Sequence, residues 1–375
     1  MQHTNFPAFL DEVITQFSFQ GQLIHCTPFG SGHINDTFLL TYRRANRSKY
    51  KVVLQKINTT AFKKPEELML NMMNICSHLR AKIGMAGGDP DRETLTPLYT
   101  KNGKPYYWDS TGGFWRATLY IADSISYNQV EKPEHFYESA LAFGRFQSLL
   151  SDFPAHTLFE TIPGFHDTAA RLEVFKQAVE EDIMGRADSV REDIQFILDR
   201  EDVAHCFGDL LKAGEIPLRV THNDTKLNNV MFDINTDKAI CVVDLDTVMP
   251  GLAMNDFGDS IRFGASTAAE DERNLNKVWC DLELFRQYTK GFLEGCQGKL
   301  TPKEVELLPM GAKVMTYECG MRFLTDYLQG DTYFKISREN QNLDRFRTHK
   351  KLVSDMEDKW EQMHQIVKEL YEAMQ

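Results

Sequence analysis

The sequence lacks several features that mark large classes of proteins. Its seven cysteines include no CxxC pair and are odd in number, which favours reduced thiols over a disulfide framework or a zinc knuckle. No run of lysine or arginine offers a stripe for nucleic-acid phosphates, and the 54 acidic residues outnumber the 42 basic ones. We therefore expect no nucleic-acid partner.

Long apolar runs are also missing. No stretch approaches the ~18 apolar residues that a membrane-spanning helix needs, and the first residues lack the basic start and apolar core of a secretory signal. These absences predict a cytoplasmic protein with no membrane partner. The phosphate-binding pattern GxxxxGK[ST] is absent as well, so a P-loop kinase is excluded.

What is present predicts an α+β protein of two lobes. At 375 residues the chain exceeds what one core usually organises. Short runs rich in β-branched and aromatic residues fill positions 23–121 and predict antiparallel hairpins, interrupted by one helix at 65–80. Long amphipathic stretches follow and predict helices. We place the boundary so that residues 1–123 form a β-rich lobe and residues 124–375 a mainly helical one.

The segment 218–251 carries the clearest chemical signal. Two apolar runs flank a polar turn and predict a β-hairpin. With the turn centred between Thr236 and Asp237, Asn229 and Asp244 lie opposite one another at the open end of the hairpin. An amide oxygen and a carboxylate form a hard oxygen site of the kind that Mg²⁺ uses together with substrate phosphates.

Asp224 lies five residues before Asn229, on the loop that enters this hairpin. A carboxylate so placed can accept a hydroxyl proton while a metal ion holds the phosphate, as phosphoryl transfer requires. The alternative is that these acidic and amide residues only cap turns, which Asp and Asn favour for local reasons. Their joint occurrence on one hairpin favours the catalytic interpretation.

The sequence HNDTKLNN, from His222 to Asn229, resembles the HxDxxxxN loop of the aminoglycoside-phosphotransferase and choline-kinase superfamily. The resemblance implies a two-lobed, protein-kinase-like fold with an N-terminal nucleotide-binding lobe and a C-terminal catalytic lobe. It also implies Asp224 as the catalytic base, Asn229 and Asp244 as Mg²⁺ ligands, ATP as co-substrate, and His222 as a structural residue of the loop.

Further motifs, FGSGHINDTF, LQKIN, DLDTVMPG, DFGDSIRFGAS and ECGMRFLTDYLQGDTYF, resemble the bacterial N-acetylhexosamine 1-kinases. This family transfers phosphate from ATP to the anomeric hydroxyl of N-acetylglucosamine or N-acetylgalactosamine, which implies ATP and a small sugar as ligands. One alternative is a kinase of the same fold that acts on homoserine, methylthioribose, choline or an aminoglycoside. Another is a non-catalytic nucleotide-binding protein.

The same resemblance implies the remaining binding residues. Glycines of the loop between the first two strands let backbone N–H groups approach phosphate oxygens, and the segment between the lobes resembles the kinase hinge that binds adenine. The acceptor sugar is assigned to Asp224 and Asp244 together with three further side chains. The nucleotide positions are Gly30, Gly32, Ile121 and Asp123, and the three further acceptor positions are His33, Arg322 and Tyr333.

One position of the kinase pattern stays open. Protein kinases hold ATP phosphates with a lysine on the third strand, and here Gln55 and Lys56 are neighbours that face opposite sides of that strand. If Gln55 faces the phosphates, the phosphate-binding lysine is absent from this strand.

Overall fold

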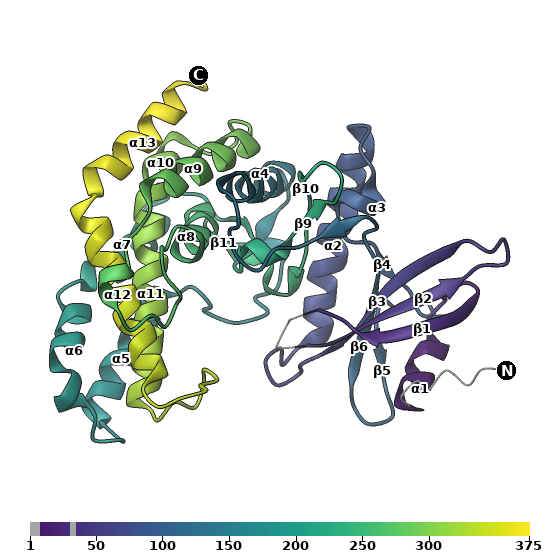
Figure 1. Ribbon diagram of the computed structural model, residues 1–375, viewed down its shortest axis with the longest axis horizontal. Helices are drawn as coiled ribbons and strands as arrows, with labels where there is room; N and C mark the ends of the chain where they lie inside the picture. Colours follow the sequence, from purple (N-terminus) through teal and green to yellow (C-terminus); the bar gives the residue numbers. More distant parts are fainter. Residues whose placement is uncertain (1–7, 31–34) are drawn as a thin grey trace. The chain divides into compact units, whose positions relative to one another are not determined.

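The computed structural model describes residues 8–30 and 35–375, and Figure 1 shows the chain from its N-terminal to its C-terminal end. The chain forms two compact units. The first comprises residues 1–125 together with two later segments, 157–162 and 231–249, and the second comprises the remainder. The assignment of nucleotide binding to residues 1–123 and of catalysis to residues 124–375 stays a prediction.

An antiparallel sheet forms the centre of the first unit. Its strands follow the order β1-β2-β3-β6-β4, with β5 also paired to β6. The strands are β1 (Gln22–Pro28), β2 (Asp36–Arg43), β3 (Lys49–Ile57), β4 (Pro97–Leu98), β5 (Tyr107–Trp108) and β6 (Phe114–Leu119). The predicted helix is α2 (Pro65–Met85), and the unit also contains α1 (Ala8–Gln16) and α3 (Pro90–Glu93).

The two faces of this sheet differ in chemistry because side chains alternate along a strand. Val52 and Leu54 of β3 and Trp115 of β6 are fully buried in one apolar cluster with residues of α1. Gln55 and Arg116 are register partners on β3 and β6. Being one position out of phase with Leu54 and Trp115, they point to the opposite face.

The predicted hairpin is formed by β9 (Val230–Asp233) and β10 (Ala239–Val242), and β7 (Ser124–Ile125) pairs with β9. Its turn is centred one position earlier than predicted, because the amide of Asp233 donates to the carbonyl of Lys238 over 2.8 Å. The carboxylate of Asp233 causes this shift by accepting the amides of Asn235 and Thr236, both at 2.9 Å. The predicted register of the hairpin, which paired Asn229 with Asp244, is therefore wrong by one position.

The second unit is mainly helical. Within it, α11 packs against α5, α8 and α12, and α4 packs against α9. A short ladder joins β8 (Arg219–Thr221) to β11 (Met249–Gly251). The helices are α4 (Pro133–Leu149), α5 (Thr168–Glu181), α6 (Arg191–Leu198), α7 (Glu201–Lys212), α8 (Ala253–Gly264), α9 (Leu282–Cys296), α10 (Pro302–Glu306), α11 (Leu308–Leu328), α12 (Gln341–Asp358) and α13 (Trp360–Glu372).

Two glycines let α8 and α11 approach closely. A Cβ atom on Gly258 would lie 2.1 Å from the carbonyl oxygen of Gly311, and one on Gly311 would lie 2.3 Å from the carbonyl oxygen of Met254. Both separations are well inside van der Waals contact, so only glycine fits at either position. This contact fixes α8, the helix that holds the candidate catalytic loop.

Two of the long amphipathic stretches are each divided into two helices. The stretch 192–211 forms α6 and α7, and the C-terminal stretch is divided between α12 and α13 at Lys359. Among the helices of the described residues, none is both long and apolar enough to cross a membrane.

Candidate active site

The loop that follows β8 is clamped to α8 by a buried carboxylate. Asp256, 1% exposed, accepts the backbone amides of His222 over 2.9 Å and Asn223 over 2.8 Å. Gln147 of α4 also donates to it over 2.8 Å. Burial raises the pKa of Asp256, although the His222 and Asn223 amides act in the opposite direction. Asn223 adopts φ +64°, and the clamp holds the loop in this left-handed conformation.

A second carboxylate of α8 holds the next part of the loop. Asp259 accepts the amide of Thr225 over 3.0 Å and pairs with Arg262 over 2.8 Å. Its burial would raise its pKa, but the charges of Arg262 and Lys226 outweigh burial and lower it. Asp256 and Asp259 are one turn apart on α8, so one helix fixes both halves of the loop.

Asp224 lies between these anchored positions, and its side chain is 26% exposed. Its Oδ1 atom pairs with Nζ of Lys226 over 2.7 Å, and its Oδ2 atom accepts from Nδ2 of Asn229 over 3.0 Å. Burial alone would lower the pKa of Lys226, but the Asp224 carboxylate outweighs it, so this pKa is raised. The structure thus brings together the predicted base, the predicted metal ligand Asn229, and a lysine to which the sequence argument gave no role.

His222 lies in an apolar environment. Its ring is fully buried and meets the rings of Phe143 and Phe146 edge-on, at centroid distances of 5.4 and 6.0 Å. Its Nδ1 atom lies 3.3 Å from the backbone amide of Asp224, which donates to it. These contacts give His222 a structural setting within the loop.

The two predicted metal ligands lie in different units. Asn229 ends a 3-10 turn, Leu227–Asn229, in the second unit. Asp244 follows β10 in the first unit and adopts φ 60° and ψ 60°, a left-handed conformation that is costly for a residue with a Cβ atom. The amide oxygen and the carboxylate are hard ligands that suit Mg²⁺.

The structure describes three of the proposed nucleotide-binding residues, and each of them lies close to the end of a strand. Gly30 follows β1 with φ +82°, which favours glycine. Gly32 and His33 fall outside the described residues. In the connection after β6, the carbonyl of Ile121 accepts from Ser124 over 2.7 Å, and Asp123 adopts φ +51°.

The side chains of Gln55 and Lys56 have different neighbours. Gln55 accepts from Nε of Arg116 over 3.0 Å, and its own amide donates to Thr37 over 3.2 Å. Lys56 instead lies over the ring of Trp115, with Nζ 5.8 Å from the ring centroid. Gln55 therefore belongs to a polar face with Arg116, and Lys56 to the side that carries Trp115.

The structure brings together the predicted acceptor residues Arg322 and Tyr333. Nη2 of Arg322 donates to the Tyr333 hydroxyl over 3.4 Å, and the guanidinium lies 5.7 Å from the centroid of Phe165. One turn earlier on α11, the buried carboxylate of Glu318 accepts from Thr168 over 2.6 Å and pairs with Nδ1 of His166 over 2.8 Å. Burial would lower the pKa of His166, but Glu318 raises it.

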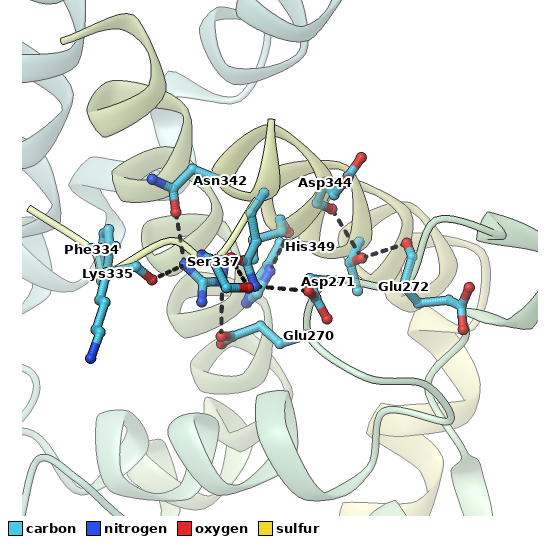
Figure 2. A network of polar contacts seen from close by, with 12 residues as sticks. Glu270, Asp271, Glu272, Phe334, Lys335, Ser337, Asn342, Asp344 and His349 are labelled. Carbon is cyan, nitrogen blue, oxygen red and sulfur yellow. Dashed lines mark hydrogen bonds and ion pairs between the residues drawn. The ribbon is translucent and has the colours of Figure 1, made fainter. Parts of the chain in front are cut away.

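The loop that carries Tyr333 is tied to two helices. Asp326 of α11 accepts the amide of Tyr333 over 2.8 Å and also the side chain of Asn342 over 2.9 Å. Figure 2 shows the loop residues Phe334, Lys335 and Ser337 beside Asn342, Asp344 and His349 of α12, with Glu270, Asp271 and Glu272 from the segment after α8. These contacts give the exposed Tyr333 a fixed backbone.

One further group of metal-ligand side chains lies in this region. In residues 8–30 and 35–375, Glu270, Cys319 and His349 are the three whose ligand atoms lie within 4.8 Å of one another. Nη1 of Arg262 donates to Glu270 over 3.1 Å and lies 3.4 Å from Nε2 of His349. The guanidinium thus already supplies a positive charge to this cluster, and we assign it no metal.

Comparison with known families decides the class of the protein. A sequence model described as the phosphotransferase enzyme family matches residues 25–282, which include the anchored loop and its α8 carboxylates. The chain belongs to this phosphotransferase family. Its loop, hairpin and clamp helix all fall inside the matched segment.

Solved structures show the fold of this phosphotransferase. An aminoglycoside phosphotransferase from Alicyclobacillus acidocaldarius is 10% identical, with a TM-score of 0.54, over 100% of this chain and 98% of that one. A microcompartment-associated aminopropanol kinase is 12% identical, with a TM-score of 0.56, over 95% of this chain and 98% of that one. An amicoumacin kinase is 11% identical, with a TM-score of 0.56, over 93% and 92%. The predicted protein-kinase-like α+β fold is confirmed.

Sequence reasoning missed the roles of Lys226, Asp256 and Asp259 in the phosphotransferase. Lys226 was visible inside the loop motif, where its spacing of two residues from Asp224 was the available signal. The α8 carboxylates are distant in sequence, each 34 positions after the amide of His222 or Thr225 that it accepts. Their adjacency depends on tertiary packing and leaves no local pattern.

Proposed function

We propose that this phosphotransferase is a kinase that transfers the γ-phosphoryl group of ATP to the anomeric hydroxyl of an N-acetylhexosamine. The observation that carries the proposal is the setting of Asp224. Its carboxylate is partly exposed and so reachable by an acceptor, while Asp256 and Asp259 hold its loop through buried backbone contacts. A general base needs such a fixed but accessible position.

In the proposed reaction, the C1 hydroxyl oxygen bonds to the γ-phosphorus as the bond from that phosphorus to the β,γ-bridging oxygen breaks. Asp224 accepts the hydroxyl proton, and ADP leaves. Asn229 and Asp244 are the proposed ligands of Mg²⁺, which when bound neutralises charge on the β- and γ-phosphates. The amicoumacin kinase of the same fold was solved with AMP-PNP and Ca²⁺, which is consistent with the use of a nucleotide and a divalent cation.

The charges around Arg322, one of the proposed acceptor residues, favour an uncharged acceptor over a cationic one. Arg171 and Arg322 interact unfavourably, and burial followed by the Arg322 charge lowers the pKa of Arg171. The nearby carboxylate of Glu318 is already engaged by Thr168 and His166. A choline or aminoglycoside cation would therefore meet two guanidinium groups and no uncommitted carboxylate among these five residues.

The experiment that tests the function is incubation of the protein with ATP, Mg²⁺ and a panel of sugars and amino alcohols, followed by phosphorus NMR. We expect N-acetylglucosamine and N-acetylgalactosamine to give a phosphate coupled to the anomeric proton. The methyl glycoside of N-acetylglucosamine is the matched control, since its C1 oxygen is blocked, and it should remain unphosphorylated. Phosphorylation of this glycoside, or a faster reaction with choline or an aminoglycoside, would contradict the assignment.

A further inference from the structure

A buried ion pair involves a residue two positions after the proposed metal ligand Asp244. Arg116 of β6 pairs through Nη1 with Oδ1 of Asp246, and both side chains are 3% exposed. Asp246 follows Asp244 by two residues, inside the short 3-10 turn Leu245–Thr247. All of these residues belong to the first unit.

Both partners of this pair are held by further side chains. Nε of Arg116 donates to Gln55 over 3.0 Å, and Nη1 lies 3.5 Å from the sulfur of Met72 on α2. The second oxygen of Asp246 accepts from Nδ2 of Asn35 over 2.8 Å. Arg116 thus connects β3, β6 and α2 to the turn that follows Asp244.

The backbone of this turn is anchored as well. The hydroxyl of Thr161 donates to the carbonyl of Asp246 over 3.1 Å, and the buried amide of Asn71 donates to the carbonyl of Val248 over 3.2 Å. Asp244 itself is in a left-handed conformation, which an L-residue keeps only when its surroundings enforce it. The Arg116–Asp246 pair is the one contact in this set between two charged side chains.

We propose that Arg116 is a positioning residue that fixes the Asp244 turn through Asp246. This inference rests on the proposed function, because it assigns Arg116 to the metal-binding half of the same site. Gln55 shares its face of the sheet with Arg116, and protein kinases carry a phosphate-binding lysine on strand β3. Here the cation comes from the neighbouring strand and is committed to a carboxylate of the chain itself. Because the Arg116 guanidinium is buried and already contacts Gln55, Met72 and Asp246, we expect that it does not bind phosphate directly.

Nucleotide affinity measured with and without metal tests this role. The full-length Arg116→Gln and Arg116→Lys variants are titrated with ADP by calorimetry, first in EDTA and then with Mg²⁺. Mn²⁺ binding is followed by electron paramagnetic resonance. We expect metal-free ADP affinity to stay within about twofold of the wild type, and the gain in affinity from Mg²⁺ to fall about tenfold or more. An equal loss with and without metal would mean direct phosphate contact and would overturn the inference.

Removing one partner of a buried pair leaves the other charge uncompensated and can unfold the protein. The double variant Arg116→Gln with Asp246→Asn removes both charges, so no uncompensated charge stays buried and the test can still be made if the single variant does not fold. If Arg116 acts through Asp246, the double variant should lose no more of the Mg²⁺-dependent gain than Arg116→Gln alone. Additive losses would overturn the inference.

Arg219 and Glu304 provide a matched control, as a buried ion pair in the second unit with side chains 12% and 0% exposed. Arg219→Gln should lower thermal stability but keep the Mg²⁺-dependent gain. If Arg219→Gln lowered the Mg²⁺-dependent gain in ADP affinity as much as Arg116→Gln does, the effect would come from general destabilisation and the inference would be overturned. The failure of every sugar as a substrate would remove the proposed function, whereas an unchanged Mg²⁺ gain in folded Arg116 variants would remove only the role of Arg116.

Discussion

The side-chain amide of Asn229 donates to Oδ2 of Asp224 over 3.0 Å and to the backbone carbonyl of the same residue over 2.8 Å. The Nδ2 group is therefore fully used within the loop, and the amide oxygen is oriented away from the Asp224 carboxylate. These two hydrogen bonds hold the side chain of the proposed base and leave the proposed metal-binding oxygen of Asn229 outside the contact.

The first prediction is that Asp224→Asn lowers kcat by about 10²–10⁴-fold, the usual contribution of a positioned base. ADP affinity should remain, because the backbone of the loop is held by Asp256 and Asp259 rather than by Asp224. Steady-state kinetics and calorimetry on the purified variant measure the two effects. Turnover near that of the wild type in a folded variant would exclude Asp224 as the base.

The second prediction concerns Asn229→Ala and Asp244→Ala. Each should weaken Mg²⁺-dependent nucleotide binding, and the double variant should lose less than the sum of the two single losses, because ligands of one ion act as a unit. Metal titration by calorimetry gives the three values. Strictly additive losses would indicate that the two residues serve separate sites.

The third prediction is a pH dependence of stability that comes from His349, which is 2% exposed. Burial, together with the charge of Arg262, lowers its pKa from 6.5 to about 4. The unfolded chain then binds a proton that the folded chain does not, so stability falls as the pH falls from about 6.5 to about 4. The linkage relation gives a loss of about 2–3 kcal/mol over this range.

Carboxylates also titrate in this pH range, so the test is a difference between variants. Urea unfolding of the wild type and of His349→Gln at pH 7 and pH 5 isolates the histidine. The variant should show the shallower dependence on pH, since glutamine carries no titratable proton. Parallel pH profiles would show that His349 does not titrate on unfolding.

The sequence predicted those parts of the site that lie within one contiguous segment. The loop from His222 to Asn229 and the hairpin after it were visible because spacing and alternation encode them locally. The turn centre was predicted one position too late, since the carboxylate of Asp233 recruits two amides, a choice that apolar patterning does not report. The ion pair of Arg116 with Asp246 spans 130 positions and depends on how β6 meets the turn after β10.

The same reasoning explains why the face of Gln55 stayed open in the sequence. Alternation along β3 requires Gln55 and Lys56 to point to opposite sides, but it does not say which side carries the apolar cluster. That assignment depends on Trp115 and Arg116 of β6 and therefore on the register between the two strands. Only the paired strands show that Gln55 shares its face with Arg116.

The last prediction concerns the acceptor. Arg322 lies near Phe165, Tyr333 and Phe334, with ring centroids 5.4 to 5.8 Å from its guanidinium carbon, and so is held as a directed donor. A site built to pair with sugar hydroxyl and acetamido groups discriminates strongly, because a wrong sugar leaves buried polar groups unpaired. We expect N-acetylglucosamine and N-acetylgalactosamine to have higher kcat/KM than glucose or galactose.

Arg322→Met tests this role of the guanidinium while it keeps most of the aliphatic packing. It should raise the KM for the sugar about tenfold or more and change the KM for ATP little, as expected for the loss of one directed contact to the acceptor. His33→Ala should also raise the KM for the sugar more than the KM for ATP. Tyr333→Phe is the milder comparison, since it removes only the hydroxyl that accepts from Arg322. If Arg322→Met raised the KM for ATP as much as that for the sugar, or left the preference for N-acetylated sugars unchanged, Arg322 would not belong to the acceptor site.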